Sequence, residues 1–436
     1  MKLLLLYRRR WWLFYLPVLL CTALALWWSA TQWKVLPPSE VLIGAGSPQD
    51  GYSMLAQRYA EQLERMGVRA ELVYSDTQKG SLDRLGRPGD ATSIGFAQGI
   101  YANANANADT GVQALAVVGQ EPVWIFSTTG GPLSLAQARG LRIAAGPASS
   151  SSFMAAMLML AHAGVRPADV QFDSSAGVAA ANALIDGKVD LVFHVAGDDS
   201  QAVQLLTRSS GIQLLGVEHA GALAAQNPRL QPLLLPQGAI ELRGDIPPRD
   251  LTLMSLQTHL LVRQDVHPAL QRALLDAAIE IHEIPNFLQR HGQFPSFRGS
   301  DFPLSATARG YSLGARPWME TLLPYRTAQY AELVFYAILP LLGIALLMLA
   351  WIPRLFDWRI SSALNHFYGD LKFLESEMDE VAADNPVALR RLLERLDNIE
   401  RQVVSLDLPD EFSERWYTLR EHLAAARERL LKLRSR

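Results

Sequence analysis

The sequence is poor in the features that several classes of protein require. It has one cysteine in 436 residues, which excludes an intramolecular disulfide and any zinc or iron–sulfur site built from several cysteines. Charged residues make up only 19% of the chain and the formal net charge is −3, so no nucleic-acid-binding surface is indicated. The mean hydropathy of +0.07 is too low for a polytopic transporter. A hydrophobic share of 49% excludes a dominantly disordered chain.

Motifs of catalysis are also missing. The patterns H-E-x-x-H, G-x-S-x-G and G-x-x-x-x-G-K-[ST] do not occur, and Gln49 stands where a third glycine would complete G-x-G-x-x-G. His194, followed by Asp198 and Asp199, is the best candidate for a reactive cluster, but a partly buried histidine beside a solvated turn is the simpler interpretation. We therefore expect no enzyme activity, no cofactor and no metal site, and we favour a binding protein.

Two long apolar segments predict membrane-spanning helices. The first covers residues 11–30, and the arginine triplet 8–10 before it places the N-terminal residues 1–10 in the cytoplasm. A cleaved signal peptide is the alternative, which the bulky pair Trp27 and Trp28 disfavours. Lipidation of Cys21 is disfavoured because this residue lies in the middle of the span.

The second apolar segment covers residues 331–352 and contains Pro340, which membrane helices tolerate. Arg354 and Arg359 follow it and return the chain to the cytoplasm. A buried helix of a globular core is the alternative. Both segments predict one topology in a bacterial inner membrane: cytoplasmic termini and about 300 periplasmic residues between the spans.

Between the two spans, short apolar strands alternate with helical stretches, which predicts parallel α/β sheets. The expected strands are residues 40–45, 70–74, 93–97, 115–118, 123–127, 141–145, 189–195 and 212–217. The expected helices include residues 53–66, 154–163 and 177–186. About 290 residues exceed one typical core, so two lobes are expected.

Glycine- and serine-rich turns follow three of these strands, at 44–47, 76–81 and 146–152. In open α/β sheets ligands bind beyond the carboxyl ends of strands. The serines 149–152 precede an apolar helix, so their hydroxyl groups and the free backbone N–H groups are suited to capture a carboxylate. An ordinary helix N-cap explains the same residues equally well.

These segments resemble the TAXI group of TRAP transporter receptors, which are type II periplasmic solute-binding proteins. The resemblance covers about residues 40–328 and rests on six motifs in the family's order. They are Gly44-Ala45-Gly46-Ser47 leading to Tyr52, Thr77 with Gly80-Ser81, Gly95-Phe96-Ala97-Gln98-Gly99, Glu121-Pro122-Val123-Trp124, Gly146-Pro147 with Ser150 and Ser152, and Ala183-Leu184-Ile185-Asp186-Gly187-Lys188-Val189-Asp190.

The resemblance implies a two-lobed type II fold that closes around a solute by a hinge motion. Lobe one would hold residues 39–127 and 251–328, and lobe two would hold residues 128–250. The implied solute is a small carboxylate or amino acid, and the implied partner is a polytopic TRAP permease. The expected ligand-binding residues are Ser47, Tyr52, Thr77, Ser81, Gln98, Ser150, Ser152 and His194. Ser150 and Ser152 would hold the anionic group, Gln98 would orient the solute, and Tyr52 would stack on it or hydrogen-bond to it.

Residues 354–436 predict a cytoplasmic helical tail. Three apolar series keep heptad spacing. They are Phe367, Leu371, Leu374, Met378 and Val381; Leu389, Leu392, Leu396, Ile399, Val403 and Leu406; and Phe412, Trp416, Leu419, Leu423, Ala426, Leu430 and Leu433. The helices would form an antiparallel bundle within the chain or dimerise as a coiled coil. The tail is either purely structural or a docking and signalling surface.

Two functions therefore follow from the sequence. The first is a membrane-tethered solute receptor for a TRAP-type transporter. The alternative is a transmembrane sensor, because a freely diffusing receptor needs neither a second span nor a helical tail.

Overall fold

The computed structural model describes residues 15–32, 36–47, 51–75, 77, 79–102, 111–380, 386–406, 408 and 412–434. It divides into two compact units, which are described separately below. One is Leu36–Glu332, here called the α/β unit, and the other combines Met1–Val35 with Leu333–Arg436. The arginine triplet 8–10 and residues 11–14 of the first expected span lie outside the described residues.

The α/β unit is built on one ten-stranded sheet with the order β2-β1-β3-β10-β4-β7-β5-β6, in which β8 also pairs with β4 and β9 with β10. The strands are β1 (Glu40–Gly46), β2 (Arg69–Tyr74), β3 (Thr92–Gln98), β4 (Val112–Thr128), β5 (Arg142–Ala144), β6 (Gln171–Asp173), β7 (Leu191–Val195), β8 (Ile212–Leu214), β9 (Leu230–Leu235) and β10 (Leu251–Arg263).

The two longest strands, β4 and β10, run antiparallel to each other through the middle of this sheet. At one end of the β4–β10 pair, β10 also pairs with β3, and β1 and β2 follow beyond it. We call this part the first half of the sheet. The other part joins β9, β8 and β7, with β5 and β6 beyond, which we call the second half. Two α/β halves connected by two shared strands, β4 and β10, agree with the predicted two-lobed α/β architecture.

Two expectations about strands were wrong. The sheet is mixed rather than parallel, because β4 and β10 are antiparallel to their neighbours. The expected strands 115–118 and 123–127 are one continuous strand that passes through Pro122. Glycine and proline within residues 119–122 resemble a turn signal, but pairing with β10 along this stretch keeps the backbone extended. Pro122 lies just before Val123, where the pairing with β7 starts.

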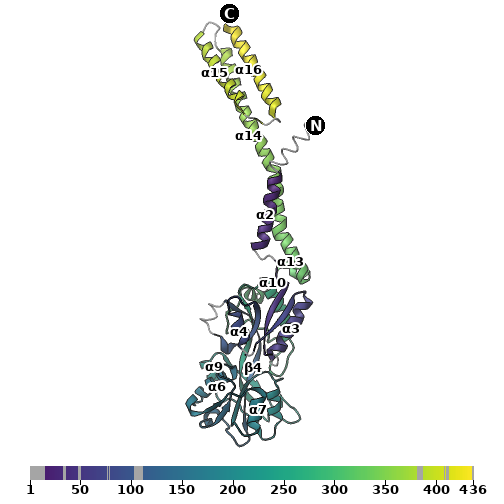
Figure 1. The fold of residues 1–436 in the computed structure, drawn as a ribbon, viewed down its shortest axis with the longest axis vertical. Coiled ribbons are helices and arrows are strands. Elements are labelled where there is room, and N and C mark those ends of the chain that lie inside the picture. The colour runs from purple at the N-terminus through teal and green to yellow at the C-terminus, as the bar shows by residue number, and fades with distance from the viewer. Residues whose placement is uncertain are drawn as a thin grey trace. The chain divides into compact units, whose positions relative to one another are not determined.

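Helices cover both halves of the sheet, with α3, α4 and α10 on the first half and α6, α7 and α9 on the second (Figure 1). The α-helices are α3 (Gly51–Arg65), α4 (Gly80–Leu85), α6 (Ser151–His162), α7 (Gly177–Ile185), α8 (Gln201–Arg208), α9 (Ala220–Gln226), α10 (Pro268–His282), α11 (Ala306–Ser312), α12 (Trp318–Leu322) and α13 (Tyr325–Leu333). Short 3-10 helices are η2 (Gly99–Tyr101), η3 (Leu135–Gln137) and η4 (Pro167–Asp169).

The helices bury their apolar faces against the sheet. In α3 the spacing of Tyr52, Ala56, Tyr59 and Leu63 places all four on one face, and all are buried with Ile94, Phe96 and the apolar face of α10. The second half has its own core around the fully buried Trp124, whose Nε1 donates a hydrogen bond of 2.9 Å to the carbonyl of Ala196. A further and larger core continues across both halves, because it joins Leu85 of the first half with Ile143 and Leu160 of the second.

The other unit contains both apolar helices. Helical residues run from Tyr325 to Glu380, and by length and composition this helix is apolar enough to cross a membrane. The helix α2 (Leu16–Gln32), whose apolar part Leu16–Trp28 is shorter, lies beside α14 (Leu339–Glu380) (Figure 1). The π-helical turn η5 (Val334–Ile338) precedes Pro340, which lacks the N–H group that a regular α-helical turn requires there.

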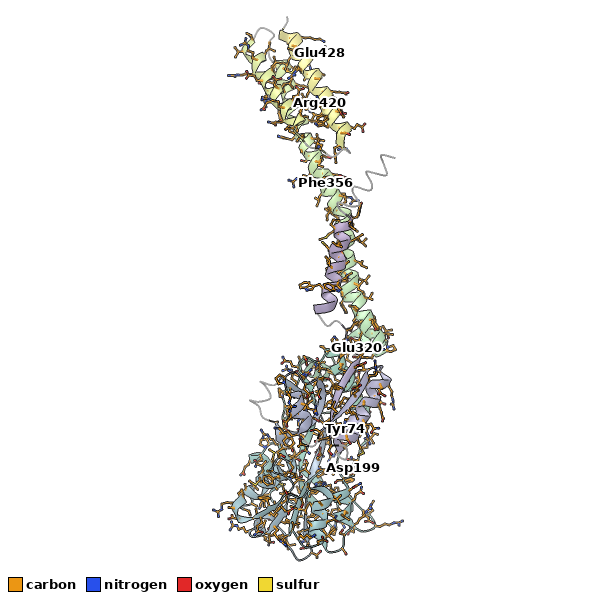
Figure 2. The ribbon with its side chains drawn as sticks, in the orientation of Figure 1. Tyr74, Asp199, Glu320, Phe356, Arg420 and Glu428 are labelled. Carbon is orange, nitrogen blue, oxygen red and sulfur yellow. The ribbon has the colours of Figure 1, made fainter. Side chains whose placement is uncertain are left out.

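The tail folds on itself. The C-terminal part of α14, α15 (Pro386–Val404) and α16 (Ser413–Arg434) share one apolar core, which contains most of the three predicted heptad series. Figure 2 labels Arg420 and Glu428 on the outer surface of α16. Val381 lies outside the described residues. Of the two arrangements expected for these helices, the structure has the bundle within one chain.

Candidate functional site

A cleft of about 980 Å³ lies between the two halves of the sheet in the α/β unit. The first half contributes the beginning of α3, the middle of β4 and the end of α10. The second half contributes the beginnings of α7 and α8 with the loop after β7. The described lining residues include Gly51, Tyr52, Arg58, Gly119, Gln120, Glu121, Gly177, Val178, Ala196, Gly197, Asp198, Asp199, Ser200, Gln201, Thr258, His282 and Asn286.

Three helices begin at this cleft. Gly51 is the first residue of α3, Gly177 the first of α7 and Gln201 the first of α8, and all three line the cleft. No side chain caps the first turn of α7 or α8. Because the first N–H groups of a helix have no partner within the helix, these ends offer donors and positive dipole ends to an anionic ligand group.

A carboxylate at the first-half side of the cleft accepts hydrogen bonds from side chains of several described elements. Glu121 Oε1 accepts from the Tyr52 hydroxyl at 2.7 Å and from Thr258 Oγ1 at 2.6 Å, and Glu121 Oε2 accepts from Gln98 Nε2 at 2.5 Å. These residues come from four different elements, α3, β3, β4 and β10. The cleft therefore presents a negative charge in a defined position.

The remaining charges of the lining come from both halves. Arg58 is exposed on α3, and no carboxylate among the described residues forms an ion pair with it. Asp198 and Asp199 follow β7; Asp199 is labelled in Figure 2. Burial, and to a lesser extent the neighbouring Asp199 carboxylate, raises the pKa of Asp198. A single cation thus faces three carboxylates in the described lining.

Two histidines near the cleft are uncharged at neutral pH. Burial lowers the pKa of His194 to about 4 and that of His282 to about 4. His194 Nε2 lies 3.0 Å from Ser200 Oγ, and the ring of His282 packs on that of Tyr59 with 5.8 Å between ring centres. These side chains offer hydrogen bonds and apolar surface rather than positive charge.

Four of the eight expected ligand-binding residues reach the cleft or its lining. Tyr52 lines it directly, and Gln98, which is fully buried, contacts Glu121. His194 contacts Ser200, and Ser152 Oγ accepts a hydrogen bond of 2.9 Å from the N–H group of Val195. All four side chains form hydrogen bonds to residues that line the cleft. Their direct contact with a solute stays a prediction.

The other four lie away from the described lining. Ser150 is the N-cap of α6: its hydroxyl accepts from the Phe153 N–H group and donates to the Ala145 carbonyl. Ser81 is buried against Gly44 and Gly95, where a larger residue than glycine would clash with it. Ser47 is half-buried and Thr77 is exposed.

Sequence reasoning missed Arg58, Glu121 and Thr258 as lining residues. Glu121 was recognised only as part of a strand motif, and nothing local distinguishes Arg58 from other surface arginines of an amphipathic helix. Thr258 becomes relevant only through the pairing of β10 with β4, in which it lies opposite Gly119. Pairing between residues this far apart leaves no short-range signal. Within the described part of the chain, no three His, Cys, Asp or Glu side chains cluster as metal ligands would.

Comparison with known proteins gives one sequence match and several similar structures. Residues 96–310 match the model of the NMT1-like family. No curated protein sequence matches the chain. The aliphatic sulphonate binding protein SsuA of Escherichia coli is 15% identical, with a TM-score of 0.39, over 71% of this chain and 84% of that one.

Two further structures show the same degree of similarity. The periplasmic sulfonate-binding protein SsuA of Methylobacillus flagellatus is 14% identical, with a TM-score of 0.38, over 69% of this chain and 87% of that one. A protein of Xanthomonas citri bound to ATP is 14% identical, with a TM-score of 0.39, over 67% and 96%. Similarity at this level transfers neither a ligand nor a permease to this chain, and the TAXI assignment stays a prediction.

Proposed function

We propose that the chain is a membrane-tethered, periplasmic solute-binding receptor that delivers a small carboxylate-bearing solute to a TRAP-type permease, and that it is not an enzyme. The observation that supports this most is the cleft between the two halves of the sheet, where α3, α7 and α8 all begin. An anionic group at the ends of α7 and α8 would satisfy N–H groups that no side chain caps.

Arg58 is the residue that we expect to contact the carboxylate from the opposite side of the cleft. A guanidinium group binds a carboxylate through two parallel hydrogen bonds, and this one has no ion-pair partner among the described residues. Closure of the two halves would then bring Arg58 and the helix ends to the same ligand group, with β4 and β10 as the connecting strands.

The first test is thermal denaturation of the full chain in detergent against a panel of small carboxylic acids and amino acids. A solute that binds only the folded state, at about 100 times its dissociation constant, stabilises by about 2.7 kcal/mol. Arg58→Gln should abolish the shift, whereas Arg208→Gln, at the exposed end of α8, should keep it. A panel without any shift would contradict the receptor function.

Transport and tethering need separate measurements. Deletion of the gene should abolish uptake of the bound solute, and normal uptake of every bound solute would rule out the transport role. We further propose that α2 and the apolar part of the helix Tyr325–Glu380 both span the membrane, with about residues 39–328 outside and the tail inside. Protease added to right-side-out vesicles should then degrade the α/β unit and spare the tail.

A second candidate function, a transmembrane sensor, is favoured by a partly buried ion pair in the α/β unit. Arg272 on α10 donates to both carboxylate oxygens of Glu320 on α12, at 2.7 and 2.6 Å, and Gln329 on α13 donates to Oε1 at 2.8 Å. His282, at the other end of α10, lines the cleft. One helix thus connects the cleft to the residues that precede the long apolar helix.

The sensor predicts that solute binding changes the tail. Arg415 Nη1 donates to Ser361 Oγ at 3.0 Å, so the substitutions Ser361→Cys and Arg415→Cys, in a Cys21→Ser background, should form a crosslink. Its rate should change on addition of solute, and the Arg58→Gln variant should lose this change. A crosslinking rate that solute leaves unchanged would favour the transport receptor.

A further inference from the structure

Three large apolar side chains are exposed in the lining of the cleft. Met54 on α3, Val178 on α7 and Ile284 after α10 are 53%, 40% and 72% exposed, and all three line it. They come from three separate segments and from both halves of the sheet. Single exposed apolar residues are common on protein surfaces, but several that share one concave surface indicate a place where an apolar group binds.

This apolar lining continues into the interior of both halves. Leu55, which follows Met54, packs against the apolar core of the first half, and Leu288, four residues after Ile284, is buried in that of the second. Both of these leucines line the cleft as well. We call Met54, Leu55, Val178, Ile284 and Leu288 the apolar wall. Because its inner members are held by core packing, an apolar ligand group would meet a surface that is already formed.

The apolar wall lies next to the groups that we propose for the anion. Met54 precedes Arg58 by four residues on α3, a spacing that places both side chains on one face of the helix, and both line the cleft. Val178 is the second residue of α7, beside the N–H groups of the first turn, which no side chain caps. A solute whose anionic group binds there would place its next carbon atoms against Met54 and Val178.

Two aromatic rings of the described lining already pack on other rings. Tyr52 is buried and stacks on Phe96, with 6.3 Å between ring centres. The ring of His282 packs on that of Tyr59. Little ring surface is thus left for an aromatic solute to stack on, whereas the exposed side chains of the apolar wall are aliphatic.

We propose that the solute is a monocarboxylate with an aliphatic chain, and that Met54, Val178 and Ile284 determine specificity by contacting this chain. This inference rests on the proposed solute-binding function and adds the chemical class of the solute. Met54 and Val178 belong to opposite halves of the sheet, so closure around the solute would remove the chain from water on both sides. Removal from water stabilises the complex of an aliphatic chain and costs free energy for a hydroxylated or charged one.

The test uses the homologous series butanoate, pentanoate and hexanoate. Binding to the full chain in nanodiscs is measured by calorimetry, and empty nanodiscs correct for uptake of the acids by the lipid. Each methylene group buried against the apolar wall should tighten binding by about fourfold and make the heat-capacity change of binding more negative. Adipate has a second carboxylate where hexanoate ends in a methyl group, and gluconate carries hydroxyl groups along its chain. Both should bind at least about tenfold more weakly than hexanoate.

Two variants make the apolar wall polar without changing its shape. Met54→Gln and Val178→Thr keep the size of the side chain, so each should reduce the gain in affinity per methylene group and weaken hexanoate binding severalfold. The matched control is Ile185→Thr, because Ile185 is exposed at the other end of α7 and outside the described lining. This variant should keep the full gain. The comparison of chain lengths in the wild type does not depend on any variant folding.

The outcomes distinguish this inference from the function on which it rests. If the acids bind but chain length has no effect, or if adipate or gluconate binds as tightly as hexanoate, the role of the apolar wall is wrong and the receptor stands. If Met54→Gln and Val178→Thr weaken every acid equally, these side chains serve closure of the halves and do not select the solute. If neither these acids nor the amino acids of the first panel bind the wild type, the receptor function and the role of the wall both fail.

Discussion

The α/β unit and the helical tail bury their residues in different ways. The bundle core of the tail is entirely apolar, and its ion pairs, such as Arg429 with Asp379, lie on the surface with side chains 59% and 62% exposed. The α/β unit also buries polar groups, among them Gln98 and Thr258, and it partly buries the ion pair of Arg272 with Glu320. Buried polar groups stabilise little for their cost, so we connect them with ligand binding and coupling rather than with folding.

The ion pair of Arg272 and Glu320 should show the largest effect. Their side chains are 15% and 14% exposed, so Arg272→Ala leaves a largely buried carboxylate without its cation and should destabilise the α/β unit by about 3–5 kcal/mol. Arg429→Ala in the tail should cost less than about 1 kcal/mol. Hydrogen exchange of the full chain measures both regions in one experiment, and equal losses would contradict the contrast between them.

The tail should depend on its apolar core instead. Leu396 is fully buried, so Leu396→Ala should destabilise the bundle by about 2–5 kcal/mol. The matched control is Leu431→Ala on α16. Leu431 is 42% exposed, so this substitution should lower the free energy of unfolding by no more than about 0.5 kcal/mol. Faster exchange in tail peptides with no change in the α/β unit is the expected pattern. Faster exchange in both would show that the two regions unfold together.

Acid should weaken the α/β unit. Burial lowers the pKa of His194, His259 and His282 to about 4, and unfolding restores a value near 6.5. Between pH 6.5 and 4 the unfolded chain therefore binds protons that the folded unit does not bind. This difference lowers the free energy of unfolding by about 1.4 kcal/mol per pH unit for each proton.

Asp301 opposes this trend in part. Burial raises its pKa to about 6, so the folded unit takes up a proton as the pH falls through 6 and gains stability. The unfolded chain gains protons at three histidines, whereas the folded unit gains one at Asp301. The free energy of unfolding should therefore fall between pH 6.5 and 5. Urea denaturation at several pH values measures the slope, and Asp301→Asn should make it steeper. A stability that rises on acidification would refute the burial argument.

The smallest effect is expected at Ser150. As the N-cap of α6 it should contribute about 1 kcal/mol, which Ser150→Ala removes. Because Ser150 lies outside the described lining of the cleft, solute affinity should stay unchanged. A loss of affinity beyond tenfold would instead support the anion-binding role that the sequence suggested for this residue.

Much of the architecture could be predicted because it depends on local patterns. The heptad series of the tail predicted its three helices, and Pro386 begins α15 as a proline at a first helical position should. Alternation of strands and helices predicted most elements of the α/β unit, since the period of apolar residues reflects which face is buried. Strand direction was predicted poorly, because the pairing of β10 with β4 joins residues more than 100 positions apart.

The sequence by itself thus determined which segments are helical, which are apolar enough for a membrane, and that two α/β halves are present. Tertiary structure decided which polar residues meet in the cleft. The serines around residue 150 carry the stronger local signal, yet Ser150 caps its own helix. The uncapped ends of α7 and α8, which have no motif, line the cleft with Glu121. A cap is a contact between residues three apart, whereas a cleft is formed by strands that pair across the whole sheet.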